Sequence, residues 1–144
     1  MEAEKNKAIV SEAMEVVFNK QNPDAVDKYY TADLANHDPN LPQIRNLEEF
    51  KQWIGALKTA FPLPYYHTVI DDIIAEGDRV VARWTNDLTG KGEYFGLPPM
   101  GKQAIFTGVT VFRFVGDKIA ECWWSYDMLG ALQQIGLIPP MGQG

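Results

Sequence analysis

The side chains available for chemistry in this sequence are mainly carboxylates. The 144 residues include 19 Asp and Glu but only two His and one Cys. A disulfide needs two thiols, and a structural zinc site usually takes four Cys or His ligands. The composition therefore argues against a disulfide within the chain and against a metal site. Acid/base chemistry then falls to a carboxylate, with a His beside it at most.

Asp127 is the first candidate for that carboxylate. It stands between a predicted strand over residues 118–126 and a helical pattern over residues 128–135. A general base needs a carboxylate that is partly desolvated, so that its pKa rises toward the working pH. The same residue could instead be the N-cap of the helix, whose N–H groups would lower its pKa. The sequence leaves both roles open.

Three further polar residues have a functional and a structural interpretation. His37 could be an acid/base group, or a loop residue whose neighbour Asp38 caps a turn. Arg83 falls opposite Asp72 in a predicted hairpin, where an ion pair is the plain explanation, or it could bind an enolate or carboxylate oxygen. Glu121 could be a second carboxylate in a pocket or the partner of a nearby Arg.

The spacing of apolar residues predicts helices first and strands afterwards. Residues 2–20 keep a helical apolar face, Asn22-Pro23-Asp24 is a helix-start signal, and Asn46 with Glu49 resembles a capping box. From His67 onward the period changes to that of strands. The predicted strands cover residues 67–75, 79–87, 102–115 and 118–126, and a closing helix covers 128–135. This order predicts one α+β domain over residues 1–144, with an antiparallel sheet, three N-terminal helices and a short C-terminal helix.

The last predicted hairpin assigns residues to the two faces of the sheet. If Gly116 and Asp117 form a two-residue turn, each opposed pair has residue numbers that sum to a constant. One face then carries Phe106, Gly108, Thr110, Phe112, Glu121, Trp123, Ser125 and Asp127. The other carries Thr107, Val109, Val111, Arg113, Ala120, Cys122, Trp124 and Tyr126. Because three helices can cover only one face, the outer face predicts a partner, most simply a second copy of the chain.

Charge and hydropathy exclude several classes of partner. The net charge is −6 and the basic residues are scattered, which argues against nucleic acid. No apolar run reaches the roughly 18 residues of a membrane span, and the N-terminal segment lacks the apolar stretch of a signal peptide. We therefore expect a cytoplasmic protein that binds neither nucleic acid nor membrane.

Several segments in a fixed order resemble one known family. They are IAEGDRVVARWT at residues 74–85, GEYFGLPP at 92–99, FRF at 112–114 and DMLGALQQIG at 127–136. Together these residues resemble the SnoaL-like polyketide cyclases, within the ketosteroid-isomerase and nuclear-transport-factor-type superfamily. The resemblance implies a cone-shaped α+β barrel, a curved sheet wrapped by helices, with a pocket inside and a homodimer through the outer sheet face. It also implies an intramolecular aldol condensation without metal or organic cofactor.

The resemblance further implies roles for single residues. The family's catalytic aspartate matches Asp127, and a His at the pocket mouth matches His37. The residues expected to contact an apolar substrate are Arg83, Glu121, Trp123, Trp53, Phe61, Phe106, Thr110 and Phe112. The leading hypothesis is an acid/base enzyme for an apolar, carbonyl-bearing molecule, with Asp127 as general base. The alternatives are a dimeric binding protein without chemistry and an epoxide-hydrolase or isomerase type of the same superfamily.

Overall fold

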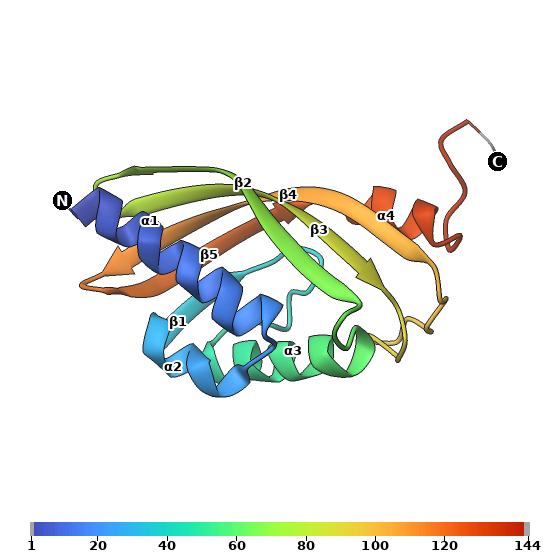
Figure 1. Ribbon diagram of the computed structural model, residues 1–144, viewed down its shortest axis with the longest axis horizontal. Coiled ribbons are helices and arrows are strands. Elements are labelled where there is room, and N and C mark those ends of the chain that lie inside the picture. The colour runs from blue at the N-terminus through green and yellow to red at the C-terminus, as the bar shows by residue number, and fades with distance from the viewer. Residues whose placement is uncertain (1, 143–144) are drawn as a thin grey trace.

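A curved five-stranded sheet carries helices on its concave side (Figure 1). The computed structural model describes residues 2–142. The strand order is β1-β5-β4-β3-β2, so the sheet is open, with β1 and β2 at its edges. The strands are β1 (Tyr30–His37), β2 (Tyr66–Glu76), β3 (Arg79–Thr89), β4 (Gln103–Val115) and β5 (Lys118–Tyr126). The predicted α+β class, with a curved sheet wrapped by helices, is confirmed.

The helices form where the sequence places their start signals. Helix α1 (Glu2–Ala13) continues into a π-helical segment (Met14–Asn19), and a 3₁₀ turn (Pro23–Ala25) leads into α2 (Val26–Tyr29). The side chain of Asn22 accepts the Asp24 N–H, and that of Asn46 accepts the Glu49 N–H at the start of α3 (Leu47–Ala60). Helix α4 (Met128–Gln134) follows β5. None of the described helices is both long and apolar enough to cross a membrane.

Strand β1 is an element that the sequence analysis did not predict. Tyr30 follows the short helix α2 directly and begins a strand that pairs in parallel with β5. The sequence does not show an apolar alternation here, because Asn36 is buried although it is polar. Its side chain accepts the Trp124 Nε1–H at 2.8 Å and donates to the Ile44 carbonyl at 2.9 Å. Strand β1 thereby joins α3, the 38–46 loop and β5.

The predicted pairing of β4 with β5 is right at the turn and wrong beyond it. Val115 pairs with Lys118 and Phe114 with Ile119, as a two-residue turn requires, but the register then shifts, leaving Ala120 as an extra residue. Arg113 therefore faces Glu121, and their side chains are 2.9 Å apart. This cross-strand ion pair favours the bulged register.

The bulge exchanges the two faces of β5. The concave face of β4 keeps the predicted Phe106, Gly108, Thr110 and Phe112, but their neighbours on β5 are Cys122, Trp124 and Tyr126. The prediction that Glu121 and Trp123 share this face is wrong, because both lie on the outer face. Tyr126, expected outside, lies inside.

Candidate functional site

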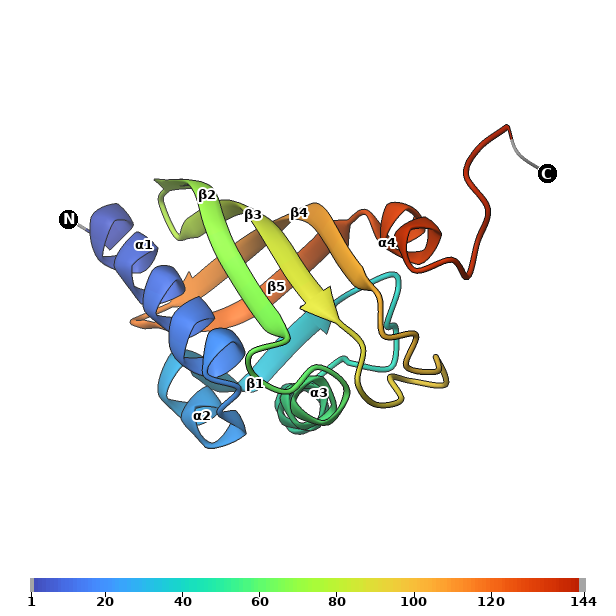
Figure 2. The same ribbon diagram turned by 45° about the vertical axis from the view of Figure 1, so that its right-hand side comes forward.

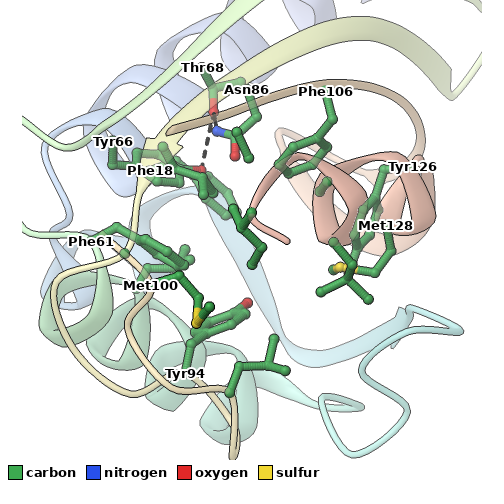
Figure 3. A pocket seen from close by; sticks show the side chains of 18 of the residues that line it. Phe18, Phe61, Tyr66, Thr68, Asn86, Tyr94, Met100, Phe106, Tyr126 and Met128 are labelled. Atoms are coloured by element: carbon green, nitrogen blue, oxygen red, sulfur yellow. Dashed lines mark hydrogen bonds between the residues drawn. The ribbon is translucent and has the colours of Figure 1, made fainter. Parts of the chain in front are cut away.

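The concave side of the sheet, α3, α4 and the loop that connects β3 to β4 face one another (Figure 2). A cavity lies among them (Figure 3). Its wall is mainly apolar and aromatic, as small-molecule pockets are. The lining side chains include Phe18, Trp53, Leu57, Phe61, Trp84, Leu88, Leu97, Met100, Phe106, Trp124, Met128, Leu132 and Ile135. Lys102 is the single charged residue among those that line the described cavity.

The phenol of Tyr126 is one of the polar groups on this wall. Its hydroxyl donates to Asp38 Oδ2 at 2.8 Å, and its ring packs beside Trp84 and Phe106. Asp38 is only 4% exposed and stands behind Tyr126 rather than on the lining itself. The Tyr126 phenol therefore lies between the cavity and the Asp38 carboxylate.

The loop after β1 holds Asp38 in this position. Asp38 Oδ1 accepts the Asn40 N–H at 2.9 Å, so the expected turn cap is present, while Oδ2 faces Tyr126. Burial raises the pKa of Asp38, and the hydrogen bond from Tyr126 offsets part of that rise. Burial and the nearby Asp38 carboxylate in turn raise the pKa of Tyr126. The pair thus joins a carboxylate of increased basicity to a phenol that is neutral near pH 7 in the resting protein.

A cluster of three polar side chains lies farther along the wall, on β2 and β3. Asn86 Nδ2 donates to Thr68 Oγ1 at 2.7 Å, and Thr68 Oγ1 lies 3.1 Å from the Tyr66 hydroxyl (Figure 3). All three residues line the cavity and all are buried. Burial raises the pKa of Tyr66 to about 12, so this phenol is neutral near pH 7.

Gly108 makes room for Tyr126 and Trp84. It pairs with both of them across the neighbouring strands. A Cβ at residue 108 would lie 2.7 Å from Tyr126 Cβ and closer still to the Trp84 indole. The indole Nε1–H is satisfied by Thr110 Oγ1 at 2.9 Å, which fixes the ring over the glycine. A glycine is therefore required for the two rings to pack side by side.

The loop between β3 and β4 closes the rim of the cavity against α3. The N–H groups of Lys91 and Gly92 donate to the Ala60 carbonyl at 2.8 and 3.1 Å. A Cβ at residue 92 would lie 2.7 Å from the Thr59 carbonyl oxygen, so this close approach needs glycine. Tyr94 then reaches inward, and its hydroxyl accepts the Trp53 Nε1–H at 2.9 Å.

The predicted contact residues divide between the cavity and its surroundings. Trp53, Phe61 and Phe106 line the cavity. Thr110 and Phe112 lie on the same face of β4 but are 0% exposed in the core and are not among the lining residues.

Asp127 is exposed at the start of α4, outside the lining residues. Its Oδ1 accepts the Gly130 N–H at 2.8 Å. A Cβ at residue 130 would collide with the Asp127 carboxylate, so Gly130 permits the contact. This geometry is that of the N-cap interpretation. The role of Asp127 as a base stays a prediction.

The other predicted polar residues lie on the outer face of the sheet. His37 Nε2 is 2.7 Å from Glu121 Oε2, and the imidazole stacks on Trp123 with ring centroids 5.5 Å apart. The hydrogen bond from His37 and the bond from Arg113 lower the pKa of Glu121. Arg83 Nη2 is 2.7 Å from Asp72 Oδ2, which confirms the cross-strand ion pair. The structure therefore joins His37, Glu121 and Trp123 to one another, but not to the cavity.

Sequence reasoning does not find Tyr126 and Asp38 as a pair at the cavity. The sequence predicts only a turn cap for Asp38, and the unbulged register predicts Tyr126 on the outer face. One signal for the bulge was present, because adjacent Ile119 and Ala120 are both apolar and only a bulge lets both be buried. Within residues 2–142, no three His, Cys, Asp or Glu side chains gather to hold a metal ion.

Comparison with known proteins gives one family and a set of similar folds. The family model of the SnoaL-like polyketide cyclases matches residues 8–135. A solved structure assigned as a polyketide cyclase from Acidithiobacillus ferrooxidans is 32% identical, with a TM-score of 0.80, over 91% of this chain and 94% of that chain. AclR from Streptomyces galilaeus, assigned as a hydroxylase, is 25% identical with a TM-score of 0.82, over 98% and 87%.

A more distant structure shares the fold alone. An LEH-like epoxide hydrolase of M. tuberculosis is 17% identical with a TM-score of 0.73, over 94% of this chain and 92% of that chain. Among curated proteins, none matches the sequence.

Proposed function

The chain belongs to the SnoaL-like polyketide cyclase family, and from this premise we propose that it is an enzyme that moves a proton on an apolar, carbonyl-bearing small molecule. The reaction is an aldol cyclisation or a related proton abstraction that needs no metal or organic cofactor. The observation that supports this most is the Tyr126 hydroxyl, which lies on the wall of an apolar cavity and 2.8 Å from the buried carboxylate of Asp38.

The two residues would act as one proton-transfer unit. The Tyr126 oxygen takes a proton from the carbon next to the substrate carbonyl while its own proton passes to Asp38 Oδ2. The C–H bond breaks, an enolate forms, and Asp38 becomes the neutral acid. In a cyclisation the enolate carbon then attacks a second carbonyl, and the proton returns through Tyr126 to the new alkoxide. The raised pKa of Asp38 favours the first transfer, because a stronger base accepts the proton more readily.

A simple ketone tests this proposal before any natural substrate is known. The probe is 2-tetralone, an apolar bicycle whose C1 hydrogens lie next to both a carbonyl and a ring. Exchange of these hydrogens in D₂O is followed by proton NMR with and without protein. We expect wild type to accelerate exchange above the buffer rate. Tyr126→Phe and Asp38→Asn should each reduce the acceleration by about 10²- to 10⁴-fold, as the loss of a general acid/base does.

Asp127→Asn serves as the matched carboxylate control. It removes the same charge from an exposed position, so exchange should stay at the wild-type rate. If Asp127→Asn abolishes the acceleration while Tyr126→Phe keeps it, the proposed unit is wrong and Asp127 is the base.

A binding protein without chemistry is the second candidate. The observation that favours it is the cap geometry of Asp127, since a carboxylate used for capping is not available in the cavity. Binding of 2-tetralone without any acceleration of exchange in wild type would favour this candidate over the enzyme.

We also propose that two copies of the chain pair through the outer face of the sheet. The described helices contact the concave side, and the outer face exposes apolar residues of the central strand β4 and of β2. Val69, Ile105 and Val109 are 46%, 49% and 38% exposed there. Pairing would remove this apolar surface from water.

A further inference from the structure

The buried cluster of Asn86, Thr68 and Tyr66 has hydrogen-bonding capacity that the described residues do not use. Asn86 Nδ2 donates to Thr68 Oγ1 at 2.7 Å and also lies 3.3 Å from the His67 carbonyl oxygen. A carbonyl oxygen can only accept, so this contact fixes which end of the amide faces the strand. The other end, Oδ1, faces away from these partners, and no donor among residues 2–142 reaches it.

The same reasoning orients the two hydroxyls. Thr68 Oγ1 accepts from Asn86 and donates to the Tyr66 hydroxyl oxygen at 3.1 Å. Because the Tyr66 oxygen accepts in this contact, its own hydrogen remains to be donated. Asn86 is 4% exposed, Tyr66 is 7% exposed, and both line the cavity. The wall therefore presents one free acceptor and one free donor next to each other.

When a ligand displaces water from the cavity, a polar atom on the wall that is left without a partner costs free energy, so the cavity favours a ligand that satisfies such atoms. A hydroxyl satisfies both, because it donates to the Asn86 oxygen and accepts from the Tyr66 hydroxyl. A methyl ether or a bare ring edge leaves Asn86 unsatisfied. We infer that Asn86 and Tyr66 form a subsite for a hydroxyl group of the substrate.

The subsite lies at a distance from the proposed proton-transfer unit. Asn86 pairs with Phe106 on β4, while Tyr126 pairs with Gly108, two residues farther along β4. Asn86 and Tyr126 are two strands apart across the sheet and two residues apart along it. In ideal sheet geometry their Cα atoms are then about 12 Å apart. Phe106 lies between them (Figure 3). The inference rests on the proposed function, because it makes the substrate a hydroxylated apolar ring system whose reactive carbonyl and hydroxyl are at opposite ends.

Two matched probes test the subsite by isothermal titration calorimetry. 2-Naphthol has a hydroxyl that donates and accepts, and 2-methoxynaphthalene has the same rings with an oxygen that only accepts. We expect wild type to bind 2-naphthol about tenfold more tightly, as one to two buried hydrogen bonds allow. Asn86→Leu should reduce this preference at least threefold while the ether binds as before. Tyr66→Phe should weaken both probes, because both have an oxygen that accepts from the Tyr66 hydroxyl. The Asn86 side-chain amide resonances should shift with 2-naphthol and not with the ether.

Tyr126→Phe is the control that separates this inference from the proposed function. The variant should keep the wild-type preference for 2-naphthol even where it loses exchange on 2-tetralone. Equal affinity of wild type for the two probes would overturn the subsite. So would a preference that survives Asn86→Leu, or a Tyr66→Phe variant that binds both probes as tightly as wild type does. A preference lost in Tyr126→Phe but kept in Asn86→Leu would place the hydroxyl at Tyr126 and overturn it as well. None of these results depends on whether 2-tetralone exchanges.

Discussion

The Tyr126 hydroxyl donates to the Asp38 carboxylate across 2.8 Å, although 88 residues separate the two in the sequence. Two features of the sheet bring them together. Strand β1 pairs in parallel with β5, which places the residue after β1 near the end of β5. The extra residue at Ala120 then turns Tyr126 toward the concave face. Without the bulge, Tyr126 would point outward and the cavity would have no contact with Asp38.

The burial of Asp38 predicts that its charge lowers the stability of the protein. Burial raises the folded-state pKa above the usual 3.8, so the unfolded chain loses its proton first as the pH rises. The free energy of unfolding therefore falls between pH 3.8 and the folded-state pKa. Asp38→Asn has no such loss, so its stability relative to wild type should increase from pH 3.5 to pH 7. The gain is about 1.4 kcal/mol for each tenfold difference between the acid dissociation constants of Asp38 in the folded and unfolded states.

Urea unfolding of both proteins at several pH values measures this difference. Other carboxylates titrate in both proteins and cancel in the comparison. Asp33→Asn, at an exposed position of β1, is the control and should show no such trend. A wild type that gains stability over Asp38→Asn as the pH rises would contradict the prediction.

Gly108 should be intolerant of even one added methyl group. Gly108→Ala places a Cβ against the Trp84 indole and within 2.7 Å of Tyr126 Cβ, so one ring must move. Overpacking of this kind costs about 1–3 kcal/mol. We expect that loss in urea unfolding, together with slower exchange of 2-tetralone because Tyr126 is displaced.

Gly55→Ala is the matched control for this substitution. Gly55 lies in α3, and nothing lies within 4 Å of a Cβ there. Replacing a glycine inside a helix with alanine stabilises the protein by about 0.5–1 kcal/mol. The same chemical change should thus have opposite signs at residues 55 and 108, and a similar sign at both would refute the packing argument.

The sequence predicts an element of this fold well when the residues that determine it are adjacent in the chain. The helix caps at Asn22 and Asn46 and the turn at Gly116 depend on a few adjacent residues, and the structure confirms them. The edge strand β1 forms through partners elsewhere in the chain, such as Trp124 for Asn36, so its own residues do not reveal it.

The site was harder to predict because one extra residue in β5 reverses the face of the sheet to which the later side chains point. The bulge at Ala120 changes the face of every later residue of β5, so a register without it predicts Trp123 inside and Tyr126 outside. The aromatic residues of α3 and β4 were unaffected, and Trp53, Phe61 and Phe106 line the cavity as expected. The apolar wall was therefore predicted in part, while its polar groups were not.

The cap at Asp127 predicts a difference between two substitutions at one position. Asp127→Ala removes the acceptor for the Gly130 N–H and should cost about 1 kcal/mol in urea unfolding. Asp127→Asn keeps an equivalent acceptor and should unfold like wild type. Asp33→Ala controls for the loss of an exposed carboxylate. Equal stability of Asp127→Ala and wild type would show that the contact has no capping role.

The outer face of the sheet predicts the oligomeric state. Val109 lies in the middle of β4 on this face, between Arg83 and Ser125, and is 38% exposed. In a dimer formed through this face it would be buried, and Val109→Lys would then place a charge in an apolar contact. Sedimentation equilibrium should show a wild-type dimer and a Val109→Lys monomer at micromolar concentrations. Leu63→Lys, at a residue that is 53% exposed in the α3–β2 connection, is the control and should remain dimeric. A wild type that sediments as a monomer, or a Val109→Lys variant that stays dimeric, would contradict pairing through this face.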